Sequence, residues 1–116
     1  MKQTVPGFAA CIKMMRQHNP QVQEDGFHQL LRHASEYVSE LLAEFRSETG
    51  LGLRCWLLEL IGAAKSPEVF PLLTENLHSD DESLRHWAVF GLEHLNTKEA
   101  RTILQKQFGN SVRDIR

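Results

Sequence analysis

In this chain of 116 residues, a carboxylate, a thiol and an imidazole follow one another at equal spacing along the sequence. Cys55 lies 31 residues after Glu24 and 31 residues before His86. These groups serve in nucleophilic catalysis and in zinc sites. The interval is far wider than in recognised zinc motifs, and no oxyanion donor or orienting group accompanies them. The residues therefore favour a non-catalytic protein, and we expect no metal and no cofactor. Whether Cys55 and His86 react together stays open.

The same interval of 31 residues relates many other positions. The sequence Leu53, Arg54 and Trp56 recurs as Leu84, Arg85 and Trp87. A weaker upstream copy has Val38, Leu41, Leu42 and Glu44, which lie 31 residues before Val69, Leu72, Leu73 and Glu75. A fixed period of this size is typical of solenoids, in which each unit buries its apolar stripe against the next one.

Apolar periodicity assigns each repeated segment to an α-helix. Apolar residues recur at three- and four-residue spacing in 84–95, and residues 53–64 follow the same pattern. Helix breaks are expected at Asn19-Pro20, Gly50 and Gly52, Ser66-Pro67 and residues 79–81. The connections are short, so neighbouring helices should run antiparallel. We expect one all-α domain over residues 1–116, with a capping helix at 4–18.

Residues 66–95 resemble a HEAT-like repeat of the short type first noted in phycobiliprotein lyases. The resemblance rests on Ser66-Pro67-Glu68-Val69, on the acidic loop before Leu84-Arg85, and on Ala88, Gly91, Leu92 and Leu95. Residues 49–52 lack the acidic loop, and Gln23 stands where the first copy should have arginine. The resemblance implies a short right-handed α-solenoid of the armadillo type. Its hairpins would span about residues 20–49, 51–80 and 82–111.

The resemblance also implies that the second helix of each hairpin lines a concave face that binds another protein. Nine candidate binding residues fall on that face: Phe27, His28, Leu58, Glu59, Arg85, His86, Val89, Phe90 and Glu93. Phe27, Leu58 and Val89 would align as an apolar column, with His28, Glu59 and Phe90 beside it. An exposed apolar column would mark an interaction site, but the same residues could complete the packing between repeats. Both interpretations stay open, and Phe90 is the hardest to explain as core.

Arginine and tryptophan occupy equivalent positions in two repeats. We expect Arg54 and Arg85 to bind acidic or carbonyl groups of the preceding loop. The alternative is an exposed basic pair that recognises an acidic ligand. Trp56 and Trp87 lie in the apolar stripe, so we interpret both as packing anchors.

The charge pattern excludes some classes of partner. The net charge is −2, and no basic stripe of the kind that binds nucleic acid is present. No apolar run approaches the ~20 residues of a membrane helix, and Cys11 and Cys55 form no motif. We therefore expect no nucleic acid, no membrane and no signal peptide, and a reduced cytoplasmic setting.

Four glutamates follow one another at four-residue spacing: Glu36, Glu40, Glu44 and Glu48. A solvated helix face is the ordinary explanation, because like charges at this spacing are tolerated in water. The functional alternative is an acidic ridge that meets a basic protein.

Taken together, the sequence predicts a non-catalytic module that binds a partner protein on its concave face. One concrete version is an inhibitor or immunity-type protein that blocks a toxin or nuclease. The alternative, from the lyase resemblance, is an accessory or lyase-like factor for cofactor attachment or protein modification. We expect a monomer or a weak homo-oligomer.

Overall fold

The computed structural model describes residues 7–115, and side chains over residues 7–108. Within that range the chain is all-α and contains no strand, as the sequence predicts. The helices are α1 (Phe8–Met15), α2 (Pro20–Arg32), α3 (Val38–Ser47), α4 (Leu51–Ala63), α5 (Phe70–Asn76), α6 (Glu82–Leu95) and α7 (Lys98–Ile115). Residues 4–6 of the predicted capping helix lie outside the described residues.

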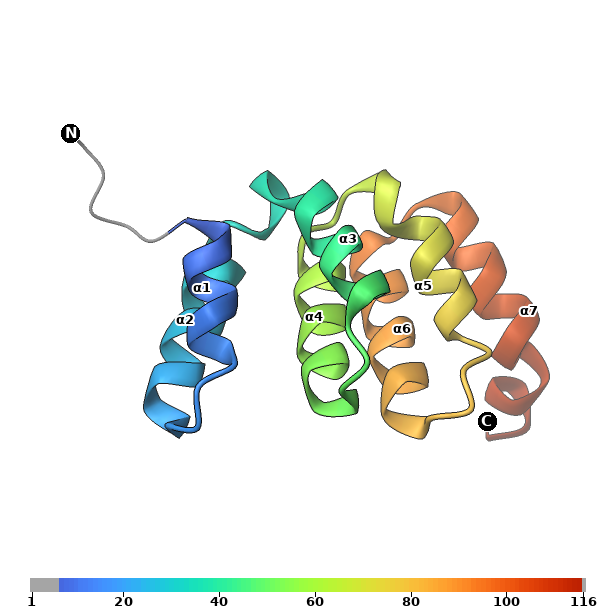
Figure 1. Cartoon of the computed structure of the whole chain (residues 1–116). Coiled ribbons are helices and arrows are strands. Elements are labelled where there is room, and N and C mark those ends of the chain that lie inside the picture. The colour runs from blue at the N-terminus through green and yellow to red at the C-terminus, as the bar shows by residue number, and fades with distance from the viewer. Residues whose placement is uncertain (1–6, 116) are drawn as a thin grey trace.

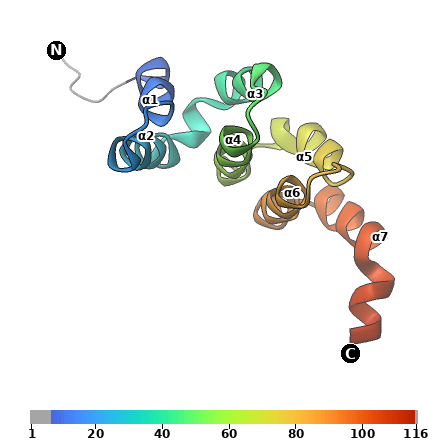
Figure 2. The same ribbon diagram turned by 60° about the horizontal axis from the view of Figure 1, so that its bottom comes forward.

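The helices are arranged in two rows. Helices α1, α3, α5 and α7 form an outer row, and α2, α4 and α6 form an inner row on the hollow side of a curved assembly (Figures 1 and 2). The molecule is elongated, with extents of 53 × 28 × 25 Å. We call α2, α4 and α6 the inner helices, and their solvent-facing side the inner face.

Local sequence sets the helix starts. The Asn19 side chain accepts hydrogen bonds from the backbone N–H groups of Gln21 and Val22, and Pro20 follows as the first helical residue. Asp81 caps α6 by accepting from the Leu84 N–H at 2.9 Å. Both caps supply acceptors for amides that a helix leaves unpaired. The start at Ser66-Pro67 differs from expectation, because a 3₁₀ turn at Pro67–Val69 precedes α5.

Helix α4 contacts α3 on the outer row and α2 and α6 on the inner row (Figure 2). Leu57, Leu58, Leu60 and Ile61 are all completely buried. Helices α4 and α6 approach closely at two glycines: a Cβ built on Gly62 would lie 2.8 Å from the Gly91 Cα. Glycine at both positions therefore permits a backbone contact that a larger residue would prevent.

Candidate protein-binding surface

Four aromatic side chains form a continuous row along α6. The ring centroids of His86 and Trp87 lie 4.9 Å apart, those of Trp87 and Phe90 lie 5.2 Å apart, and those of Phe90 and His94 lie 4.0 Å apart. Edge-to-face and tilted contacts at these distances are favourable for aromatic rings. We call these four residues the α6 aromatic row. It places a chain of touching rings on an inner helix, with His86 and His94 exposed to solvent.

Phe90 is the unusual member of this row. Its side chain is half-buried. Within residues 7–108, its neighbours Trp87 and Val89 pack on the apolar core, but Phe90 does not. A Cβ built on Gly62 would lie 3.6 Å from a Phe90 ring carbon, so the ring lies against the backbone of α4. Phe90 thus contacts the rings of Trp87 and His94 and the α4 backbone at Gly62, and it remains partly exposed to solvent.

The expected apolar column does not lie open to solvent. Leu58 is fully buried and Phe27 is only 7% exposed. Val89 is half-buried and packs on the core. Their burial supports the packing interpretation that the sequence left open. Helix α4 has α2 on one side and α6 on the other within the inner row, and the Leu58 side chain is not accessible to a partner.

The polar candidates remain accessible. His28, His86 and Glu93 are exposed, and Glu59 is half-buried on α4. Burial raises the pKa of the Glu59 carboxyl above its ordinary value, while the neighbouring His28 acts in the opposite direction. Glu59 is therefore a carboxylate that is only partly solvated.

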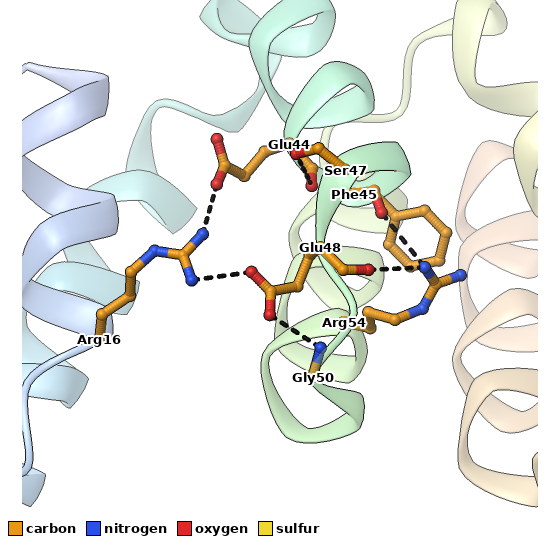
Figure 3. Close-up of polar contacts among 7 residues, drawn as sticks. All are labelled: Arg16, Glu44, Phe45, Ser47, Glu48, Gly50 and Arg54. Atoms are coloured by element: carbon orange, nitrogen blue, oxygen red, sulfur yellow. Dashed lines mark hydrogen bonds and ion pairs between the residues drawn. The ribbon is translucent and has the colours of Figure 1, made fainter.

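Both repeat arginines bind the loop that precedes their helix. Arg54 donates from Nη1 to the Glu48 carbonyl oxygen at 2.9 Å (Figure 3), and Arg85 donates from Nη1 to the Ser79 carbonyl oxygen at 2.7 Å. The Arg54 guanidinium also lies 4.1 Å from the centre of the Phe45 ring. The loop-binding interpretation of these arginines is confirmed. Each ties a loop to the helix that follows it.

Comparison with known families agrees with this arrangement. Residues 84–109, from α6 into α7, match the family model described as PBS lyase HEAT-like repeat. This match over 26 residues supports a HEAT-like repeat protein. No curated protein and no solved structure matches it. No helix among the described residues is long and apolar enough to cross a membrane.

The two tryptophans are only partly core residues. Trp56 and Trp87 are half-buried and pack on the core. Trp56 stacks on Phe27 with ring centroids 5.1 Å apart, which joins α4 to α2. It also lines an open groove of about 470 Å³, together with Met15, Arg16, Gln23, Gly52 and Leu53. Trp87 additionally belongs to the α6 aromatic row.

The expected acidic ridge is partly neutralised by a cation at the end of α1. Arg16, at the end of α1, binds Glu44 at 2.6 Å and Glu48 at 2.8 Å (Figure 3). Glu48 also accepts from the Gly50 N–H at 2.8 Å. This backbone hydrogen bond is the main reason that the pKa of Glu48 is lowered; burial opposes it and Arg16 adds to it. The ridge therefore includes a structural contact between α1 and α3.

The Cys55 thiol, one of the groups with catalytic potential, is half-buried on α4. Burial is the main cause of a raised pKa at Cys55; Asp81 adds to the effect and Arg54 opposes it. A raised pKa leaves less of the nucleophilic thiolate at neutral pH. No three His, Cys, Asp or Glu side chains gather as a metal-binding group among the described residues.

Two features of the site were missed by sequence reasoning. Trp87 and His94 belong to the aromatic row, and the spacing Trp87, Phe90, His94 is a signal that could have found it, because residues three and four apart share a helix face. Arg16 has no such signal, since its partners lie 28 residues away or more.

Proposed function

We propose that this chain is a non-catalytic protein-binding module whose inner face receives a partner protein. Phe90 carries the proposal: its ring is half-buried, contacts other rings, and lies outside the apolar packing on the core. Partly exposed aromatic residues in a rigid setting are frequent anchors of protein interfaces. His28, Glu59, His86 and Glu93 would supply polar contacts around that anchor.

The proposal includes the finer architecture. Three repeats over about residues 20–49, 51–80 and 82–111 would form a short right-handed solenoid behind the N-terminal capping helix. The 31-residue period supports the repeat length. The consecutive helices that pack together include α1 with α2, α3 with α4 and α5 with α6, and the second helix of each of these pairs lies in the inner row. Such an array offers a preformed surface, which lowers the entropy cost of binding. An inhibitor or immunity-type protein acting in the cytoplasm would use the surface in this way.

Partner capture with matched variants tests the proposal. Immobilised wild-type protein, Phe90→Ala and His78→Ala are exposed to the same lysate, and retained proteins are identified by mass spectrometry. His78→Ala removes an exposed ring from the loop after α5 and serves as the control. A specific partner should be retained by wild type and by the control, and lost from Phe90→Ala with a cost of about 2 kcal/mol or more. Retention by Phe90→Ala with unchanged affinity would refute Phe90 as the anchor.

The second candidate is an accessory or lyase-like factor for cofactor attachment or protein modification. The description of the matched repeat favours it. In that case the inner face would hold the protein substrate, and transfer of a group to the substrate would depend on the presence of this chain. A modified product that forms equally fast without the chain would exclude this role.

A further inference from the structure

The inner helices carry an excess of negative charge. Helices α2, α4 and α6, which the structure describes completely, contain three arginines, no lysine and five carboxylates. The carboxylates are Glu24, Asp25, Glu59, Glu82 and Glu93. Their balance of −2 (three minus five) equals the net charge of the whole chain. The remaining charges of the chain therefore cancel, and the net negative charge lies on the inner helices.

The arginines do little to offset these carboxylates on the inner face. Arg54 and Arg85 donate to loop carbonyl oxygens at 2.9 and 2.7 Å, which directs them toward the ends of their helices. Arg32 is exposed, but it is the last residue of α2 and therefore lies at the C-terminal end of that helix. The three arginines of the inner helices thus lie near helix ends, whereas Glu59 lies in the middle of α4.

Glu59 lies in the middle of this face. The nearby His28 favours the charged form of Glu59, but by less than burial disfavours it. It is half-buried on the central inner helix, and within residues 7–108 it forms no hydrogen bond or ion pair. A partly desolvated carboxylate without a hydrogen-bond partner is costly, and a cation placed beside it recovers that cost. His28 and Phe90 lie 31 residues before and after Glu59, at equivalent positions of the neighbouring repeats.

We propose that the segment of the partner recognised by the inner face is cationic, with a lysine or arginine paired to Glu59 and a neighbouring apolar side chain packed on Phe90. This inference rests on the proposed function and adds the chemistry of the partner. The negative inner helices would attract such a segment from a distance. The α6 aromatic row would then provide the apolar contact and a ring face for the cation.

Three synthetic peptides with the same leucines test this chemistry. Their remaining positions carry lysine, glutamine or glutamate, and binding to the full chain is measured by fluorescence anisotropy. Glu59→Gln removes the central charge while keeping the side-chain shape. Glu99→Gln removes the same charge from exposed α7 and is the control. The lysine peptide should bind wild type and Glu99→Gln, and should bind Glu59→Gln about tenfold more weakly. Added salt should weaken its binding to wild type.

The outcomes separate this inference from the proposed function. If the glutamine or glutamate peptide binds as tightly as the lysine peptide and Phe90→Ala abolishes that binding, the inner face binds protein but the cationic assignment is wrong. Equal affinity of wild type and Glu59→Gln for the lysine peptide, or no binding of any peptide, also overturns the assignment. Loss of partner capture by Phe90→Ala remains an independent test of the binding surface.

Discussion

Replacing Gly62 by alanine tests the closest approach between α4 and α6. A Cβ on Gly62 would lie 2.8 Å from the Gly91 Cα and 3.4 Å from the Gly91 N. Both are backbone atoms of α6, so no side-chain rotation can relieve the contact. To bring the distance between this Cβ and the Gly91 Cα from 2.8 Å to an ordinary contact of 3.4 Å, the two helices must separate by at least about 0.6 Å. That separation would loosen the packing along the whole crossing.

The magnitude follows from two opposing effects. Alanine in place of glycine stabilises a helix interior by up to about 1 kcal/mol. Inserting a methyl group into a packed contact costs about 1–3 kcal/mol. Gly52 lies in the same helix and has nothing within 4 Å of its built Cβ, so Gly52→Ala makes the same substitution without the clash. We expect Gly62→Ala to be less stable than Gly52→Ala by about 1–3 kcal/mol.

Urea unfolding followed by circular dichroism at the helical band measures this difference. Each kcal/mol should also appear as a difference of roughly 4 °C in Tm. Because Gly62 supports the Phe90 ring, Gly62→Ala should weaken partner binding as well, whereas Gly52→Ala should not. Equal stability of the two variants would refute the close approach of α4 and α6, and with it the placement of Phe90 against α4.

Two further predictions concern local contacts. The pKa of Glu48 is lowered in the folded protein, so its contribution to stability is present above the ordinary carboxyl pKa of 4.5 and is lost as the pH falls through the lower folded value. Between about pH 5 and pH 3 the melting temperature of wild type should therefore fall more steeply than that of Glu48→Gln; parallel curves would contradict a stabilising role for Glu48. Asp81→Ala should cost about 1 kcal/mol in urea unfolding because it removes the cap of α6, and Asp80→Ala should cost less. Similar losses in both aspartate variants would argue against the cap.

Much of the fold follows from the sequence because its determinants are local. Apolar stripes and caps such as Asn19 and Asp81 act over a few residues along one helix. The 31-residue period can be read directly by comparing the sequence with itself. The pairing of Arg85 with its own preceding loop is equally local, because donor and acceptor residues are six positions apart. These features could be predicted without knowing how the helices pack.

The tertiary structure decided which side chains a partner could reach. Phe27 and Phe90 both fall on predicted inner-face positions, yet Phe27 is 7% exposed and packed in the core, whereas Phe90 packs outside it. Exposure depends on what the neighbouring helices cover, and that coverage depends on contacts such as Gly62 with Gly91 between residues distant in sequence. The periodic pattern determines which face of each helix is apolar, while the distance and crossing of adjacent helices determine how much of that face remains available for binding.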